Sequence, residues 1–448
     1  MSVGAIKRLC GILVALLVPL PAVLLFFHGN WYSFFHSYSL AMFFGIFGYG
    51  YFCVALMLSA RLRLLDRLYG HDRVLVFHGI MAGLALLAAF LHAVFKRMFM
   101  PGYTLQIVLG IAGFTLFVGV ILLTVVFMIQ TPLNRFFLTA GIFDKINKCL
   151  PIDYSLLKLL HNLTSLALLL IVVHVLLAWP VQENMARTFL MGSMGFLALV
   201  IFIHHKFIRP AVCFLRAGQV TAVRRLCPSI TEIELEPPAS RRFAQRPGQF
   251  CYFRFLSPVC GRAEHPFTIS SAPGDSKLSI IVKDLGDYTA KLTHLQIGAK
   301  ALVDGPYGVF SPRPAKQPLL FLAGGIGITP LLAILRDYRE NPPDRNVRLI
   351  WSVHDPEELV VLEELQQMQA QCAFFQLDVR VTGGINPVSG KQDSRLDKPT
   401  LEQCLSSLGK EEVAVYLCGP ESFRRGTITR LRSLGVPASR IHFEKFSF

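Results

Sequence analysis

Charged residues are scarce in this sequence. They make up 16% of the 448 residues, while hydrophobic residues make up 53%, which is too apolar for an ordinary soluble protein of this length. The scarcity is also uneven. Residues 1–210 are rich in Leu, Phe, Val and Ile, whereas residues 216–448 have an ordinary globular composition. The sequence therefore predicts a membrane half followed by a soluble half.

Several other patterns are missing. The ten Cys form no Cys-x-x-Cys pair and no disulfide-framework spacing, which fits a reducing compartment for the soluble half. The net charge is +15, yet no basic run is interleaved with aromatic residues, so we expect no nucleic-acid partner. The positive excess fits an anionic membrane surface and nucleotide ligands. Nothing in the sequence indicates an obligate protein partner.

Six apolar stretches are close to the length of about 20 residues that crosses a bilayer. The sixth carries His204-His205 at its end, and we take the first as a retained helix rather than a signal peptide. The stretches are Leu9–Phe27, Leu40–Leu58, Val74–Phe95, Leu105–Ile129, Leu159–Trp179 and Phe189–Phe207.

The loops between these stretches predict the orientation. The loop 59–73 carries four Arg, whereas the loop 28–39 carries no Lys or Arg. Because positive loops stay on the cytoplasmic side, we expect both termini in the cytoplasm. The compact length suggests a bacterial protein, and hence the inner membrane.

The soluble half divides into two predicted domains. Short alternating runs within 217–312, broken by Pro and Gly, predict a small antiparallel β-barrel. Residues 316–448 alternate strand-like and helix-like runs, which predicts a parallel sheet covered by helices on both faces. The expected domains are 1–210, 216–313 and 316–448.

Four histidines lie within the predicted membrane helices. His78 and His92 are 14 residues apart in the third helix, and His161 and His174 are 13 apart in the fifth. These spacings correspond to about 21 and 20 Å along a helix axis, and a 13-residue spacing falls about 140° short of whole turns. Two matched pairs can bind two stacked haems through both axial positions, with a tilt or bend absorbing the mismatch. The alternative is that they are packing histidines.

The segment His265-Pro266-Phe267-Thr268-Ile269-Ser270-Ser271 follows Arg246-Pro247-Gly248-Gln249-Phe250. This segment follows a predicted four-histidine helix bundle. With these features the sequence resembles the NADPH oxidase and ferric-chelate reductase superfamily over nearly the whole chain. The resemblance implies that the segment holds FAD, with the Thr268 hydroxyl near the reactive edge of the flavin. An ordinary barrel strand with an edge Pro is the alternative. The implied FAD residues are His265, Pro266, Phe267, Thr268, Ser270 and Ser271.

Two glycine-containing loops fit phosphate groups. Within 283–289, a Gly between a strand and a short helix can turn backbone N–H groups toward a phosphate, and the resemblance assigns this loop to the FAD pyrophosphate. A plain turn explains it equally well. The segment 322–330 follows a strand and opens a helix, as a nucleotide loop requires, and it matches the Gly-Gly-x-Gly-x-Thr-Pro form of ferredoxin-reductase-like domains. The residues concerned are Lys283, Gly286, Thr289, Gly324, Gly325, Gly327, Thr329 and Pro330.

The resemblance also places residues around the nicotinamide. It puts Cys418, followed by Gly419 and Pro420, beside the hydride-donating carbon. A near-terminal aromatic, Phe446 or Phe448, would stack on the flavin. His354, helped by Lys391 and Arg395, would bind a 2′-phosphate and favour NADPH slightly over NADH.

These features together predict an NAD(P)H oxidase or ferric-reductase flavocytochrome b. Electrons would pass from cytoplasmic NAD(P)H through FAD and two b-type haems to an extracytoplasmic acceptor. O2 is the favoured acceptor and a ferric chelate the second. Two rival interpretations are a haem protein that feeds a protein partner, and a haem-free membrane anchor for a diaphorase domain.

Overall fold

The computed structural model describes residues 11–30, 33, 35–97, 102, 104–128, 154–237, 244–261, 263–312, 316–393, 395–409 and 412–445. The chain forms two compact units, Met1–Arg209 and Pro210–Phe448, and each is described by itself.

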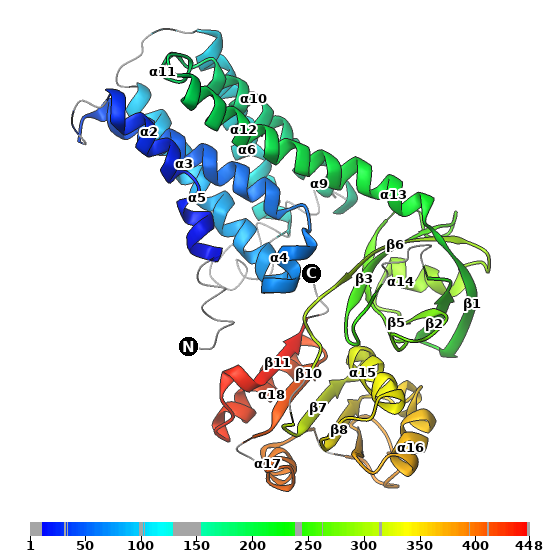
Figure 1. Cartoon of the computed structure of the whole chain (residues 1–448). Helices are drawn as coiled ribbons and strands as arrows, with labels where there is room; N and C mark the ends of the chain where they lie inside the picture. Colours follow the sequence, from blue (N-terminus) through cyan, green and yellow to red (C-terminus); the bar gives the residue numbers. More distant parts are fainter. Residues whose placement is uncertain are drawn as a thin grey trace. The chain divides into compact units, whose positions relative to one another are not determined.

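The first unit confirms the prediction of six membrane helices (Figure 1). The sixth span is not short: it covers Met185–Leu215 and is the longest of the six. His204-His205 marks a π-helical turn, η1 (His204–Ile208), between α12 (Met185–Ile203) and α13 (Arg209–Leu215), rather than a helix end. The other spans are Gly11–His28, Ser37–Leu58, His71–Arg97, Leu105–Val125 and Leu156–Leu176.

Two helix pairs form the centre of this unit. Helix α3 (Ser37–Leu58) packs on α5 (His71–Arg97), and α6 (Leu105–Met128) packs on α10 (Leu163–Leu176). Glycines permit close backbone contact, as is usual between membrane helices. A Cβ on Gly48 would lie 3.1 Å from the Ala89 nitrogen, and one on Gly113 would lie 3.1 Å from the Ala167 oxygen. The shorter helices of the unit are α2 (Leu20–Asn30), α4 (Arg63–Tyr69), α9 (Tyr154–His161) and α11 (Trp179–Gln182).

The fifth span is broken at Asn162, between α9 and α10. The Asn162 N–H donates to the Leu159 carbonyl at 3.1 Å, and the Ser165 N–H donates to the Asn162 carbonyl at 3.0 Å. Both bonds reach back three residues instead of four, which winds the chain more tightly than an α-helix. The break acts in the direction that the 13-residue histidine spacing requires, since extra rotation brings the two side chains closer to one face.

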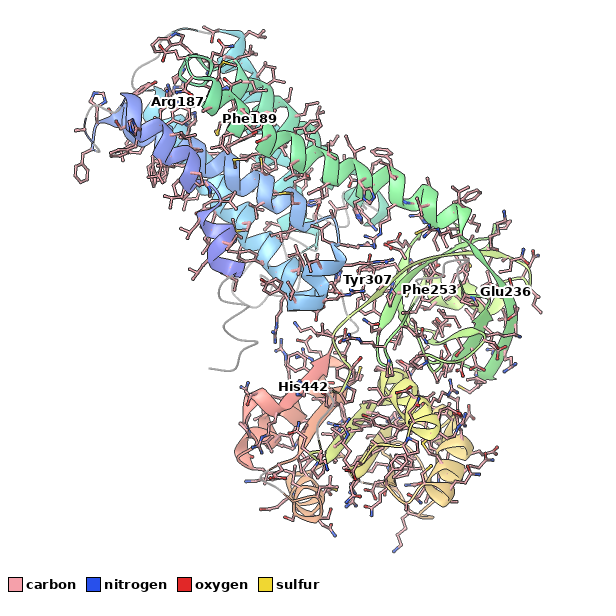
Figure 2. All side chains as sticks on the ribbon, viewed as in Figure 1. Arg187, Phe189, Glu236, Phe253, Tyr307 and His442 are labelled. Atoms are coloured by element: carbon pink, nitrogen blue, oxygen red, sulfur yellow. The ribbon has the colours of Figure 1, made fainter. Side chains whose placement is uncertain are left out.

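The first part of the second unit is an antiparallel sheet of six strands in the order β4-β3-β6-β1-β2-β5. The sheet curves round on itself (Figure 1). Its ends are joined where the Ser270 N–H donates to the Ser279 carbonyl at 2.8 Å, which agrees with the predicted barrel. Phe253 is fully buried inside and Tyr307 is buried nearby (Figure 2). The strands are β1 (Gly218–Cys227), β2 (Ile230–Leu235), β3 (Phe250–Leu256), β4 (His265–Thr268), β5 (Leu278–Lys283) and β6 (Lys300–Tyr307).

The second part is a parallel sheet in the order β11-β10-β7-β8-β9. One buried cluster contains residues of α15 and α16, and a separate cluster contains residues of α17 and α18. Helices therefore cover both faces, as predicted. The elements are β7 (Leu319–Gly324), α15 (Ile328–Glu340), β8 (Val347–Val353), α16 (Leu362–Gln371), β9 (Phe375–Val381), α17 (Lys398–Ser407), β10 (Ala414–Cys418), α18 (Glu421–Ser433) and β11 (Ile441–Glu444).

Candidate functional site

The four membrane histidines face one another in two pairs. The ring centroids of His78 and His161 are 6.2 Å apart, and those of His92 and His174 are 6.3 Å apart. Two imidazoles bound to one metal ion at about 2 Å per bond have centroids about 6 Å apart. Each pair therefore has the separation that an iron between two axial imidazoles requires, and the residues fit the predicted haems.

Three of these rings are oriented by backbone carbonyls of a neighbouring helix. A carbonyl only accepts hydrogen bonds, so the Nδ1 atom must carry the hydrogen and Nε2 keeps its lone pair. An Nδ1–H bond of this kind also orients a metal-binding imidazole and raises its basicity. The Nδ1 to oxygen distances are 2.8 Å for His78 and Ala55, 2.8 Å for His92 and Ala41, and 2.7 Å for His174 and Gln106.

The fourth ring has a side-chain partner instead. The Nδ1 atom of His161 lies 3.0 Å from the Thr124 hydroxyl oxygen, and that hydroxyl donates to the Val120 carbonyl at 2.8 Å. Because the hydroxyl hydrogen is already used, its oxygen accepts from the His161 Nδ1–H. All four histidines therefore present Nε2 as the nitrogen able to bind a metal.

Glycines opposite the second pair make room for the rings. A Cβ on Gly45 would lie 2.6 Å from the Nδ1 atom of His92, and one on Gly110 would lie 2.6 Å from that of His174. Neither residue was predicted from the sequence. A signal was available, because α3 and α6 share the pattern Gly-Ile-x-Gly at 45–48 and 110–113, which marks two helices that pack in the same way.

The predicted flavin segment forms β4 and the turn that follows it. His265 stacks on Tyr288, with ring centroids 3.7 Å apart, and Thr268 is buried opposite Phe250. Beyond the strand, the hydroxyl oxygens of Ser270 and Ser279 are 2.9 Å apart. The flavin assignment of this segment stays a prediction, and in this structure Ser270 also joins the two ends of the barrel sheet.

The serine next to it has a similar structural contact. The Ser279 N–H donates to the Ser271 hydroxyl oxygen at 3.1 Å. Ser271 is buried, with 4% of its surface exposed. Both serines therefore support the barrel end on which the expected flavin strand lies.

The predicted pyrophosphate loop is organised by Thr289. Its hydroxyl oxygen accepts from the N–H groups of Leu285 at 2.9 Å and Gly286 at 3.1 Å. Lys283 forms an ion pair with Glu358 of the following domain. In this structure Lys283 thus bridges the barrel and the parallel sheet.

The structure brings the two predicted nicotinamide-nucleotide motifs together at the carboxyl ends of β7 and β10. A Cβ on Gly419 would lie 3.0 Å from the Gly324 Cα, and one on Gly327 would meet the backbone of Cys418. Gly325 has φ +54°, which glycine adopts readily. The Trp351 indole donates to the Gly325 carbonyl at 3.0 Å. Trp351 is a supporting residue that the sequence analysis did not identify.

The remaining residues of the two motifs flank this contact. Thr329 and Pro330 are buried in the first turn of α15, and the Thr329 hydroxyl donates to the Ile326 carbonyl at 3.2 Å. Pro420 precedes α18 at its N-terminal end. Both helices therefore begin beside the glycine contact.

Cys418 is fully buried at the end of β10. Burial, and then the nearby Glu444 carboxylate, raises the pKa of its thiol well above the ordinary value. The group is therefore a neutral thiol at physiological pH, because both causes disfavour the thiolate.

Exposed cationic residues lie beyond β8 and β9. His354 follows β8, and its Nδ1 atom is 3.4 Å from the Thr382 hydroxyl oxygen. Lys391 and Arg395 are exposed in the segment after β9. The predicted flavin-stacking residues Phe446 and Phe448 lie outside the described residues.

Comparisons with known proteins agree with this architecture. Residues 219–311 match a FAD-binding domain, and residues 321–428 match an oxidoreductase NAD-binding domain. The electron transfer component of toluate 1,2-dioxygenase from Pseudomonas putida is 27% identical over 231 residues, 51% of this chain and 66% of that protein. The respiratory burst oxidase homolog protein A of Solanum tuberosum is 28% identical over 274 residues, 54% of this chain and 27% of that protein.

A solved ferredoxin NADP+ reductase from Neisseria gonorrhoeae, with bound FAD and NADP, is 25% identical. It matches 52% of this chain and 98% of its own, with a TM-score of 0.45.

The paired domains make the chain a flavin- and NAD(P)-dependent oxidoreductase of the ferredoxin-reductase type. Within that class, the match to the plant oxidase supports the resemblance to the NADPH oxidase and ferric-chelate reductase superfamily. The matched region spans about two thirds of the Pseudomonas relative and a smaller share of the plant protein.

We predict that Gly110→Ala removes the haem expected between His92 and His174 and keeps the one expected between His78 and His161. The new methyl would lie 2.6 Å from the His174 Nδ1 atom, so the ring must rotate away from its carbonyl and from His92. Gly119→Ala on the same helix is the control, because a Cβ there meets nothing within 4 Å. Haem content per protein, measured by pyridine haemochrome, should fall by about half in the first variant only. Equal haem content in both variants would contradict the assignment of this pair.

We also predict that Cys418 resists alkylation in the folded protein between about pH 7 and pH 9, because iodoacetamide reacts with thiolates. The raised pKa means that deprotonation costs folding stability once pH rises above the thiol's value in the unfolded chain. Mass spectrometry of the Cys418 peptide measures the reaction, and urea-unfolded protein is the positive control. Modification of folded protein that increases across this range would show an accessible, ordinary thiol.

Proposed function

We propose that this protein is a transmembrane oxidoreductase that passes electrons from cytoplasmic NAD(P)H, through FAD and two b-type haems, to an extracytoplasmic acceptor. One observation carries the proposal: two histidine pairs with centroids 6.2 and 6.3 Å apart lie in the same chain as FAD-binding and NAD-binding domains. The predicted orientation, with both termini in the cytoplasm of a bacterial inner membrane, supports this direction of transfer.

The residues of the second unit would bind and align the two reactants. A Cβ on Gly325 would have only the Glu358 Oε2 atom near it, at 3.7 Å, so a dinucleotide backbone can approach closely there. Strand β4 would hold the flavin along His265 to Thr268. The flavin, when bound, accepts a hydride and releases electrons singly, which is why a haem protein fed by NAD(P)H needs it.

The nicotinamide would lie beside Cys418. As a neutral thiol, Cys418 adds no negative charge beside a transferring hydride. Exposed Lys391 and Arg395, together with His354, support a preference for NADPH, since a 2′-phosphate attracts cations.

The histidines of the first unit would hold the haems at two depths. His78 and His161 would form the cytoplasmic pair, and His92 and His174 the outer pair. An iron held by both imidazoles of a pair would have no position left for O2. The final acceptor must then be reduced without binding to iron, and O2 reduced in this way by one electron is superoxide. A ferric chelate is the second candidate acceptor, and a haem b reductase that feeds a protein partner is the third.

We predict that NADPH reduces both haems of the purified, FAD-loaded protein under anaerobic conditions. On admission of air, the haem absorbance should return rapidly to the oxidised spectrum, and a reporter should be reduced in a reaction that superoxide dismutase suppresses. Rapid reoxidation with superoxide supports the oxidase, whereas slow reoxidation in air but fast reoxidation by a ferric chelate favours the second acceptor. Haems that NADPH never reduces would contradict the electron path.

A further inference from the structure

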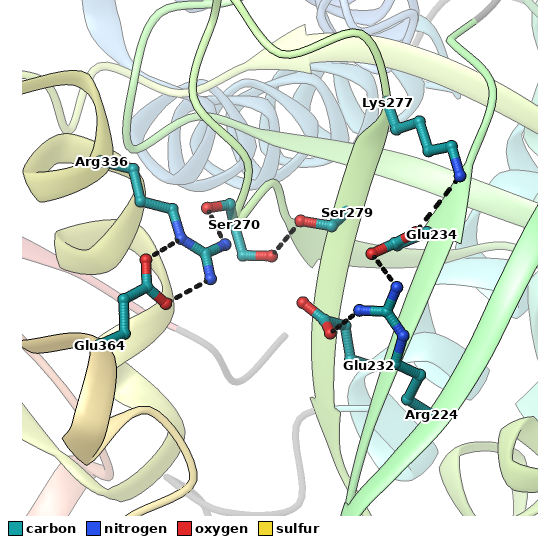
Figure 3. A network of polar contacts seen from close by, with 8 residues as sticks. All are labelled: Arg224, Glu232, Glu234, Ser270, Lys277, Ser279, Arg336 and Glu364. Carbon is teal, nitrogen blue, oxygen red and sulfur yellow. Dashed lines mark hydrogen bonds and ion pairs between the residues drawn. The ribbon is translucent and has the colours of Figure 1, made fainter. Parts of the chain in front are cut away.

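Arg336 connects the two domains of the second unit (Figure 3). It lies on α15 of the NAD-binding domain, and its Nη1 atom donates to the Ser270 carbonyl of the FAD-binding domain at 2.9 Å. Its Nε and Nη2 atoms donate to the two carboxylate oxygens of Glu364, both at 2.7 Å. The paired bonds to Glu364 fix the plane of the guanidinium, so the direction of its bond to Ser270 is fixed as well.

Ser270 is a rigid point in the barrel. It lies two residues beyond Thr268, the end of β4, and none of its surface is exposed. Its N–H donates to the Ser279 carbonyl, and its hydroxyl is bonded to the Ser279 hydroxyl. A shift of the Ser270 carbonyl would therefore move the end of the expected flavin strand.

The nucleotide loop leads directly into helix α15, and Arg336 lies on that helix. The helix begins at Ile328, directly after Gly327. Arg336 is eight residues further on, about 12 Å along the axis. The bond to Ser270 thus sets the distance and angle between the glycine loop, where the nucleotide is expected, and the strand where the flavin is expected.

Other contacts hold the two domains together without this bond. Lys283 pairs with Glu358 across the same boundary. Ile230, Ile281 and Phe310 of the FAD-binding domain belong to the buried cluster of the NAD-binding domain. Loss of Arg336 would therefore change the alignment of the domains without separating them.

We propose that Arg336 is a positioning residue for hydride transfer, and this inference rests on the function proposed above. It touches no reacting atom. It acts by holding the Ser270 carbonyl, so that the nicotinamide and the flavin meet at the distance and angle that transfer requires. Misplacement of reacting groups by about 1 Å can cost roughly a hundredfold in rate.

The test is anaerobic stopped-flow reduction of FAD in the full-length protein by increasing NADPH. Arg336→Gln should lower the limiting rate of flavin reduction by roughly tenfold, while the dissociation constant for NADPH and the FAD content stay unchanged. Arg336→Lys should restore only part of the rate, because lysine has one flexible donor group in place of the rigid fork.

Arg348→Gln is the matched control. Arg348 forms the same kind of bond, with Nε donating to Asp378 at 2.6 Å and Nη1 to Ser407 at 2.9 Å, but within the NAD-binding domain. Its limiting rate should equal that of the wild type. Glu364→Gln provides a second test if Arg336→Gln loses FAD. It should lower the limiting rate of flavin reduction, but by less than Arg336→Gln does.

Two results would overturn the inference. One is a normal limiting rate in Arg336→Gln, with or without a change in the NADPH dissociation constant. The other is an equal loss of limiting rate in Arg336→Gln and Arg348→Gln. If Arg336→Gln cannot retain FAD, a normal rate in Glu364→Gln would also overturn it. Failure of NADPH to reduce the wild-type flavin would instead contradict the proposed function itself.

Discussion

A histidine can bind iron through Nε2 only if its other ring nitrogen carries the hydrogen. In this protein that condition is met by hydrogen bonds between helices, which run from Nδ1 to carbonyls of α3 and α6 or to the Thr124 hydroxyl. These bonds need the rings close to a neighbouring backbone, and Gly45 and Gly110 provide that space for His92 and His174. The helix pairing, the orientation of the rings and the two centroid separations near 6 Å depend on these hydrogen bonds from Nδ1 to a neighbouring helix.

The second unit also depends on glycines that permit close contact, but for a different purpose. Gly324 and Gly419 bring the ends of β7 and β10 into backbone contact, and a Cβ on either glycine would also meet the Phe423 side chain. The barrel in turn depends on the bonds between Ser270 and Ser279. Arg336 links that junction to the helix that begins at the glycine loop. The proposed electron path thus begins at the expected nucleotide and flavin sites, and their relative placement depends on a few polar contacts.

The sequence predicted the parts whose signals are local. The six apolar stretches were visible from their length, and the barrel strands and the parallel sheet from their alternating patterns. The histidine pairs followed from spacing. The break at Asn162 was not predicted, although it lies in the polar segment His161-Asn162-Leu163-Thr164-Ser165. Lys283 was expected at a phosphate, but its pairing with Glu358 joins residues 75 positions apart. Strand β11 has four residues at the sheet edge, too few for a periodic pattern.

The central claim is that electrons cross the membrane through the two histidine pairs. The most direct measurement uses sealed proteoliposomes that contain FAD-loaded protein, with NADPH added outside and membrane-impermeant ferricytochrome c trapped inside. Molecules whose second unit faces outward should reduce the trapped cytochrome c, and this reduction should be lost in His92→Ala protein that still accepts hydride at the flavin. Trapped cytochrome c that stays oxidised while NADPH is consumed outside would contradict it.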